Sequence, residues 1–322
     1  MKGLILCAGR GTRLQPFSYL TSKVLLPVAN KPLIFYNIEK LIALGITEIG
    51  IVIQPAQHDM FMDAVGKGER WGIQLTYIYQ QGPNGIADAV KQSEGFIGRD
   101  SFMLLLGDNL IEHSLLELKQ SIVTEGFDGA LLLGEVKKPQ DYGIVEIQEG
   151  KIVGLEEKPQ HPKSNLAIMG AYAFTSRIFE AVQAISPSKR GEYEMTDAIS
   201  YLINLGLSIS YVVTYDSHTD VGTTERWLEA NRWMLDKVAG TDDQDSYVSG
   251  TNTIIPPVLI DSSSVLEHCV VGPYVVVGPQ VVLNHCEMED SIILEDVFLS
   301  RCKLKGSIVS RQYAVPPLEG DA

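Results

Sequence analysis

The chain has 322 residues, of which 45% are hydrophobic and 20% are charged. A chain of this length and composition can bury a large core, which excludes intrinsic disorder and fibrous repeats. Its 26 Lys and Arg residues against 40 Asp and Glu residues give a formal net charge of −14, the opposite of the balance that nucleic-acid and membrane-surface partners require, so we expect neither.

Up to about residue 240, short apolar runs rich in β-formers alternate with amphipathic helical stretches. The predicted strands cover residues 3–7, 48–53, 74–79, 102–106, 130–136, 144–147, 167–174 and 208–214. The predicted helices begin near residues 31, 57, 85, 114, 177, 193 and 223. This alternation predicts an α/β fold: a Rossmann-like mixed, mostly parallel sheet flanked by helices. In such sheets ligands bind beyond the carboxyl ends of the strands.

The N-terminus and the cysteines bear on the compartment. Residues 1–9 carry one Lys and a short apolar run, but Arg10 and Arg13 follow at once. The segment therefore predicts a buried strand rather than an export signal. The 4 cysteines form no CxxC pair, and we expect a reducing cytoplasm. Three of them, at positions 269, 286 and 302, recur once per coil of the repeat described next, which favours buried stacked side chains over metal binding.

A polar, acidic stretch at 240–252 predicts a linker, and the periodicity changes after it. Apolar residues then recur at every sixth position: Leu259, Val265, Val271, Val277 and Leu283, resuming after a phase slip at Ile292, Phe298 and Leu304. Such a repeat indicates a short parallel β-helix of about three coils. An ordinary run of short strands is the alternative. We expect a catalytic domain over residues 1–240 and a linker with the β-helix over residues 241–322.

The loop at 7–14, directly after the first strand, contains two glycines and two arginines. Glycine lets backbone N–H groups approach an anion, and Arg13 can contact phosphate oxygens with two N–H groups at once. Lys23 and Lys31 follow, and no acidic residue occurs before Glu39. A local positive segment on an acidic chain predicts a small polyanionic substrate.

Two well-known glycine loops do not match this segment. The dinucleotide-binding fingerprint needs a third Gly where Leu14 stands, and it needs an acid about 20 residues later. The Walker loop needs Gly-Lys-Ser/Thr, which the segment lacks. Taken alone, the loop is also compatible with a tight structural turn.

The motifs in their order resemble the sugar-1-phosphate nucleotidylyltransferases, and most closely the long-form glucose-1-phosphate thymidylyltransferases with a C-terminal left-handed β-helix. The matching stretches are Gly9-Arg10-Gly11-Thr12-Arg13-Leu14, Lys23 to Val28, Lys31-Pro32, Gln80 to Ala89, Gly107-Asp108-Asn109, Asp141-Tyr142-Gly143, Glu156 to Pro159, Arg190-Gly191-Glu192 and Asp220 to Thr223. The resemblance implies transfer of a thymidylyl group from dTTP to glucose 1-phosphate, giving dTDP-glucose and pyrophosphate with Mg²⁺.

The resemblance also implies a role for each matching residue. Arg13, Lys23 and Lys158 would be catalytic. The nucleotide would contact Ala8, Gly9, Gly11, Thr12, Arg13, Gln80, Gly85 and Asp108. The sugar phosphate would contact Tyr142, Gly143, Glu157, Lys158, Ile168 and Gly170. Asp108 and Asp220 would bind the metal. The sugar phosphate would attack the α-phosphate in line, already ionised and without a general base.

Each of these motifs also has a plainer interpretation. Asp108 before Asn109 can form a turn or a helix cap, and the segment around Gly85 can form a simple turn. The neighbours Glu157 and Lys158 can form an exposed ion pair. Three substitutions depart from the family pattern: Ala8 for Gly, Val24 for the Gln typical of thymidylyltransferases, and Val221 for Thr.

Other functions stay open at this stage. Within the class, the alternatives are a UTP–glucose-1-phosphate uridylyltransferase and a mannose-1-phosphate guanylyltransferase, since thymine and uracil differ by one methyl group. Outside it, the chain could be a catalytically silent subunit that binds nucleotide sugars. The β-helix also suggests a homo-oligomer.

Overall fold

The computed structural model describes residues 1–238 and 247–316. The chain divides into two compact units, one formed by residues 1–10 and 34–218 and the other by residues 11–33 and 219–322. The expected boundary between residues 240 and 241 lies outside the described residues and stays a prediction. Residues 11–33 and 219–238 group with the C-terminal strands, and each unit is described by itself below.

The first unit is built on a nine-stranded mixed sheet in the order β10-β9-β11-β6-β1-β4-β5, with β8 paired to β11 and β12 paired to the other side of β8. Its strands are β1 (Lys2–Leu6), β4 (Glu48–Ile53), β5 (Gln74–Tyr79), β6 (Phe102–Leu106), β8 (Gly129–Glu135), β9 (Gly143–Gln148), β10 (Lys151–Glu157), β11 (Leu166–Phe174) and β12 (Ile209–Thr214). Strands β6, β1, β4 and β5 are parallel, and β12 is parallel to β8. Strand β11 is antiparallel to β6, β8 and β9. The predicted Rossmann-like sheet is confirmed.

The described helices are α1 (Leu33–Ala43), α2 (His58–Val65), α3 (Ile86–Gln92), α4 (Glu94–Ile97), α5 (Leu116–Val123), α6 (Ile178–Ala184), α7 (Met195–Asn204) and, in the second unit, α8 (Thr224–Val238). Seven of them begin within two residues of the predicted starts, whereas the short helix α4 was not predicted. Strand β10 was not predicted, nor were the short strands β2 (Pro27–Val28), β3 (Lys31–Pro32), β7 (Asn109–Ile111) and β13 (His218–Asp220).

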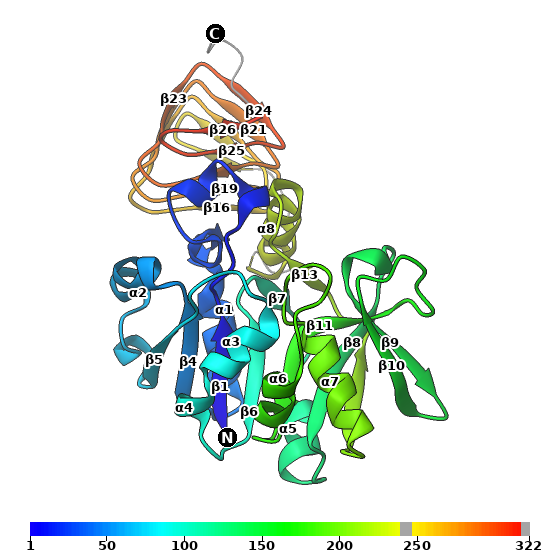
Figure 1. Cartoon of the computed structure of the whole chain (residues 1–322). Coiled ribbons are helices and arrows are strands. Elements are labelled where there is room, and N and C mark those ends of the chain that lie inside the picture. Colours follow the sequence, from blue (N-terminus) through cyan, green and yellow to red (C-terminus); the bar gives the residue numbers. More distant parts are fainter. Residues whose placement is uncertain (239–246, 317–322) are drawn as a thin grey trace. The chain divides into compact units, whose positions relative to one another are not determined.

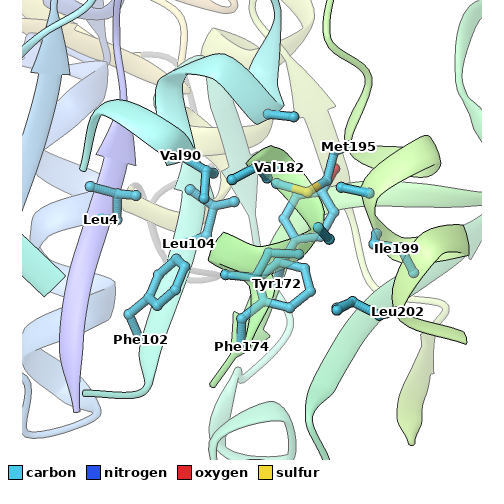
Figure 2. Packing of buried hydrophobic residues seen from close by; sticks show 14 of the residues in the cluster. Leu4, Val90, Phe102, Leu104, Tyr172, Phe174, Val182, Met195, Ile199 and Leu202 are labelled. Carbon is cyan, nitrogen blue, oxygen red and sulfur yellow. The ribbon is translucent and has the colours of Figure 1, made fainter. Parts of the chain in front are cut away.

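One core cluster of the first unit packs helices onto the sheet. Figure 2 shows Phe102 of β6 beside Tyr172 and Phe174 of β11, with Met195 and Ile199 of α7 packed near them. The rings of Phe102 and Phe179 stack at 6.0 Å. Each such side chain gains roughly 1.5–3 kcal/mol from leaving water. This packing fixes where the strands end, and the candidate site begins at those ends.

In the second unit, the C-terminal strands stack into a parallel β-helix, as Figure 1 shows. The strands are β14 (Tyr247–Ser249), β15 (Asn252–Ile254), β16 (Val258–Ile260), β17 (Val265–Glu267), β18 (Val270–Val271), β19 (Val275–Val277), β20 (Val282–Asn284), β21 (Glu287–Glu289), β22 (Ile292–Ile293), β23 (Phe298–Ser300), β24 (Lys303–Lys305), β25 (Ile308–Val309) and β26 (Ala314–Val315). Three parallel stacks form its sides: β15-β18-β21-β24, β16-β19-β22-β25 and β17-β20-β23. This confirms the predicted β-helix and is consistent with the left-handed form.

The predicted phase of the repeat is wrong at several positions. Val265 is 52% exposed and Phe298 is 70% exposed, whereas the neighbour Leu299 belongs to the core cluster and Leu266 packs against it. Leu259 and Ile292 also lie outside this cluster, which their neighbours Ile260 and Ile293 contact or join. The physical reason is coil length: successive coils repeat after 17 and then 16 residues, so a strict hexad drifts out of register. Cys269 and Cys286 are buried in the core of the β-helix, as predicted. The Sγ atom of Cys302 lies 3.3 Å from that of Cys286.

Helix α8 holds the segment that follows the first loop. This segment contains the short 3₁₀ turns η1 (Thr12–Leu14), η2 (Phe17–Tyr19) and η3 (Lys23–Leu25) and the strands β2 (Pro27–Val28) and β3 (Lys31–Pro32). Trp227 Nε1 donates to the carbonyl of Pro27 at 2.6 Å, and the Trp227 ring meets Phe17 edge-on at 5.5 Å. The backbone N–H of Ala29 donates to Asn231 Oδ1 at 3.0 Å. None of the described helices has the length and apolar character to cross a membrane.

Candidate active site

Strands β1 and β6 end side by side, and residues predicted to face the nucleotide follow both. The N–H of Gly107 donates to the carbonyl of Leu6 at 2.9 Å, which joins the two strand ends. Ala8 and Gly9 follow β1, and Asp108 lies in the turn after β6. Gln54 Nε2 donates to the carbonyl of Ala8 at 2.7 Å and fixes the start of the loop. The first unit therefore brings the loop's beginning and Asp108 to one edge of the sheet.

The rest of the loop belongs to the second unit. Gly11 has a φ of 62°, and a Cβ there would lie 3.1 Å from Lys23 Cβ, so the loop turns closely against Lys23. Thr12 and Arg13 are exposed in η1. A Cβ on Gly222 would lie 3.0 Å from Arg13 Nη2. The absence of a side chain at Gly222 thus lets the Arg13 guanidinium approach the backbone that follows β13.

The predicted metal ligand Asp220 is the last residue of β13. Its Oδ2 atom would be 3.3 Å from a Cβ on Gly222, and its Oδ1 atom accepts a hydrogen bond from Arg226 Nη1. Within residues 1–238 and 247–316, no group of three or more His, Cys, Asp or Glu side chains could hold a metal ion. One or two separate carboxylates, such as those of Asp108 and Asp220, fit Mg²⁺, because proteins usually bind this ion through one or two carboxylates together with substrate phosphates and water.

Gln80 and Gly85 form a compact corner at the end of β5. Gln80 is 4% exposed, and its Nε2 atom donates to the carbonyl of Gly85 at 3.0 Å and to Asp88 Oδ2 at 2.8 Å. Both amide hydrogens are therefore used inside the protein. Gly85 has a φ of 101°, and a Cβ there would lie 2.5 Å from the carbonyl of Tyr193. The carbonyl oxygen Oε1 is the other polar atom of the Gln80 amide, and it can act only as an acceptor.

Glu157 lies in a cluster of charges at the end of β10. Arg190 lies within 3.6 Å of Glu157 Oε1, 3.5 Å of Glu192 and 3.3 Å of Glu194. Burial, followed by the negative charge of Glu194, raises the pKa of Glu157 to about 7, although Lys158 and Arg190 oppose the shift. The neighbours Glu157 and Lys158 are therefore not a simple exposed ion pair, because the Glu157 side chain is 23% exposed.

Lys158 and Tyr142 are joined across the β9–β10 hairpin. The N–H of Lys158 donates to the carbonyl of Tyr142 at 2.9 Å, and Lys158 has a φ of 45°. A Cβ at Gly143 would lie 2.8 Å from Thr196 Cγ2 and 2.9 Å from Glu157 Oε2. The structure thus brings Tyr142, Gly143, Glu157 and Lys158 together.

Ile168 and Gly170 lie on β11, at an irregularity in its pairing with β8. Ile168 is buried. A Cβ at Gly170 would lie 2.2 Å from Asn109 Nδ2, and that amide donates to the carbonyl of Met169 at 3.0 Å. Asn109 thereby ties the turn that carries Asp108 to the strand that carries Gly170.

The sequence analysis assigned no role to three residues that the structure brings into these clusters: Arg190, Glu194 and Arg226. Arg190 stands in a motif that the resemblance quoted, so a signal was present. Thr196 Oγ1 is buried and has no hydrogen-bond partner among the described residues. Val24 and Val221 are wholly buried, so these two departures from the family pattern face the core.

The family model described as "Nucleotidyl transferase" matches residues 2–237. A glucose-1-phosphate thymidylyltransferase of Streptomyces antibioticus is 38% identical, over 98% of this chain and 93% of its own length. The protein of the same description in Streptomyces griseus is 36% identical over the same shares.

Two solved structures similar to this chain are also of sugar-nucleotide-forming enzymes by their descriptions. One, described as a putative glucose-1-phosphate thymidylyltransferase from Bacillus anthracis in complex with a sucrose, is 34% identical with a TM-score of 0.69, covering 73% of this chain and 96% of that one. A UDP-glucose pyrophosphorylase complexed with UDP-glucose is 27% identical with a TM-score of 0.65, covering 73% of this chain and 98% of that one.

Proposed function

The chain belongs to the nucleotidyl transferase family and is a nucleotidyltransferase that acts on a sugar 1-phosphate, and from this premise we propose that it joins dTTP and glucose 1-phosphate to give dTDP-glucose and pyrophosphate. The observation that carries the proposal is 38% identity to a thymidylyltransferase along 98% of the chain. The match includes the β-helix and is not confined to a motif.

The proposed reaction needs no general base, because the phosphate oxygen of glucose 1-phosphate is ionised at neutral pH. That oxygen attacks the α-phosphorus of dTTP, a new P–O bond forms, and the bond to the β-phosphate oxygen breaks with pyrophosphate leaving. Catalysis then consists of positioning and charge neutralisation. We assign these roles to Arg13 and Lys23 at the triphosphate and to Lys158 at the sugar phosphate.

The nucleotide end is proposed to bind at Ala8, Gly9, Gly11 and Thr12 through backbone and hydroxyl groups, and at the Gln80 corner through its base. Because Gln80 Nε2 is engaged by Gly85 and Asp88, Oε1 would accept the imide N–H of thymine. Uracil presents the same imide N–H group. This geometry therefore supports a pyrimidine without separating the two bases.

The sugar end is proposed to lie against Tyr142, Gly143, Ile168 and Gly170, with Glu157 binding sugar hydroxyls. A carboxyl group whose pKa is raised to about 7 can accept from a hydroxyl when ionised and donate to one when protonated. The lack of a side chain at Gly143 lets the Glu157 carboxyl group pack against that backbone, which supports a fixed position for this carboxyl group.

We further propose Asp108 and Asp220 as carboxylate ligands of Mg²⁺. The bound ion would supply a Lewis acid that offsets negative charge at the α-phosphate. In this proposal, Asp108 contributes from the turn that Asn109 fixes to β11, and Asp220 contributes from the end of β13. Assembly into a homo-oligomer and a cytoplasmic location, to which 4 free cysteines are suited, complete the proposal.

A uridylyltransferase is the second candidate, favoured by the likeness to the UDP-glucose pyrophosphorylase structure. A silent regulatory subunit is disfavoured, since the chain keeps Arg13, Lys23 and Asp108, which a subunit released from catalysis would be free to lose.

The test of the proposal uses Arg13→Ala and Asp108→Asn. We expect each to lower kcat/KM by at least about 100-fold, because each removes a group that acts on developing charge. Arg177→Ala, an exposed residue of the α6 N-terminus paired with Glu180, is the control and should retain turnover. Near-normal turnover in either test variant, measured by pyrophosphate release with circular dichroism as a check of folding, would refute the assigned roles.

A further inference from the structure

The ion pair between Asp220 and Arg226 is unusual in its position. Arg226 lies in the first turn of α8, and its N–H donates to Thr223 Oγ1 at 3.3 Å. The first turn of a helix carries partial positive charge, so a guanidinium is electrostatically disfavoured there. The carboxylate of Asp220 compensates: Arg226 Nη1 donates to Oδ1, and both side chains are only partly exposed, at 29% and 25%.

A second guanidinium lies beside the same carboxylate. Arg13 Nη2 and Asp220 Oδ2 both border the space that a Gly222 side chain would fill. Two positively charged groups thus lie near the Asp220 carboxylate. Such a cluster attracts phosphate more readily than it attracts a free divalent cation, although Asp220 is the proposed metal ligand.

We propose that Arg226 is a positioning residue that acts as the resident counter-ion of Asp220 and so couples metal binding to nucleotide binding. The inference rests on the proposed role of Asp220 as a metal ligand. In the free protein, Arg226 neutralises and orients the carboxylate, and a divalent ion must compete with it. When a triphosphate is present, its oxygens offer Arg226 another partner, and Asp220 becomes available.

Two opposite effects follow for Arg226→Gln. The affinity of the free protein for Mn²⁺ alone, followed by the electron paramagnetic resonance of unbound Mn²⁺, should rise about tenfold, which corresponds to about 1.4 kcal/mol. The affinity for dTTP in EDTA should fall several-fold, because a phosphate-facing charge is lost. Arg226→Lys keeps the charge without the planar fork and should lie between wild type and Arg226→Gln in both measurements.

Arg232→Gln is the matched control, because Arg232 lies on the same helix and pairs with Asp290. Its Mn²⁺ and dTTP affinities should equal those of the wild type. In the Asp220→Asn background, Arg226→Gln should no longer change Mn²⁺ affinity, which separates a specific pair from a general charge effect.

Circular dichroism first checks that the Arg226→Gln and Arg226→Lys proteins are folded. The inference is overturned when both bind Mn²⁺ no more tightly than the wild type while Asp220→Asn alone weakens Mn²⁺ binding. That result would leave the metal role of Asp220 in place. If Asp220→Asn and Asp108→Asn both bind Mn²⁺ and Mn²⁺–dTTP as the wild type does, the metal assignment itself is wrong, and the inference is wrong with it.

Discussion

Gly143 packs closely against Thr196 and Glu157. The proposed sugar-binding part of the site therefore requires a residue without a side chain at this position. Gly143→Ala would place a Cβ 2.8 Å from Thr196 Cγ2 and 2.9 Å from Glu157 Oε2. We expect an overpacking cost of roughly 1–3 kcal/mol and a raised KM for the sugar 1-phosphate, measured by urea unfolding and steady-state kinetics.

Gly154→Ala on β10 is the control for this prediction. A Cβ there would come no closer than 3.4 Å to Glu146 Oε2, which is an ordinary contact. A Gly143→Ala protein with the stability and KM of the control would contradict the account of the pocket.

The raised pKa of Glu157 predicts a pH dependence of stability. Its pKa is about 7 in the folded protein and near 4.5 when unfolded, so the folded state binds the proton more tightly. The stabilisation is complete below about pH 4.5 and is lost as the pH rises through 7. Glu157→Gln cannot ionise, so relative to wild type it should gain on the order of 1–3 kcal/mol between pH 4.5 and 8.

Urea unfolding at intervals of pH measures this difference. Glu146→Gln, on the neighbouring strand β9, is the matched control and should follow the wild type in parallel. A Glu157→Gln curve that also stays parallel to the wild type would mean that burial and Glu194 do not act on this carboxyl as described.

The identities of the candidate site residues were predictable from the sequence, whereas their hydrogen-bond partners were not. Gln80 was predicted, but the use of both its amide hydrogens depends on Gly85 and Asp88 in the folded corner. Arg190 has two acidic partners close by in sequence, Glu192 and Glu194, but its contact with Glu157 depends on the fold.

At the scale of elements, helix α8 fixes the segment that carries Lys23. Trp227→Phe removes the hydrogen bond to Pro27 while keeping a large ring beside Phe17. We expect a loss of about 0.5–1.5 kcal/mol and a several-fold rise in KM for dTTP as Lys23 loses its support.

Trp233→Phe, on the same helix, is the comparison, because Trp233 contacts the Lys237 ammonium. Steady-state kinetics at saturating glucose 1-phosphate should show the KM change in Trp227→Phe alone. Equal KM values in the two variants would mean that α8 does not position the segment.

The elements of the sheet were predictable, and the register of the β-helix was not. Apolar runs such as Phe102–Leu106 predicted strands correctly because buried strands contain little else. Strand β10 was missed because its ends carry the charged residues Lys151, Glu156 and Glu157 and because Gly154 interrupts its apolar residues. In the β-helix, the number of residues per coil changes from 17 to 16. This change arises at a corner between strands, and the apolar repeat of the strands does not reveal it.

At the scale of the whole molecule, an exposed apolar row on the β-helix bears on assembly. Val265, Val282 and Phe298 are in register on β17, β20 and β23, with 52%, 37% and 70% of each residue exposed. We expect the protein to assemble and Phe298→Glu to shift it toward the 35.4 kDa monomer, measured by sedimentation velocity.

Val270→Glu, on the stack that also carries the Lys303–Glu287 ion pair, is the matched control and should leave the mass unchanged. A wild-type protein that sediments as a monomer, or a Phe298→Glu protein with unchanged mass, would contradict the expected assembly. Truncation near residue 240 is a poorer test, because residues 11–33 and 219–238 belong to the same compact unit as the β-helix.

The most direct test of the proposed activity is pyrophosphate release by the wild-type protein across dTTP, UTP, GTP and ATP with glucose 1-phosphate and mannose 1-phosphate, each with and without Mg²⁺. We predict the highest kcat/KM for dTTP with glucose 1-phosphate, an equimolar yield of dTDP-glucose by mass spectrometry, and no release without the metal. Absence of pyrophosphate release with every pair of substrates in the presence of Mg²⁺ would contradict the assignment as a sugar-1-phosphate nucleotidyltransferase.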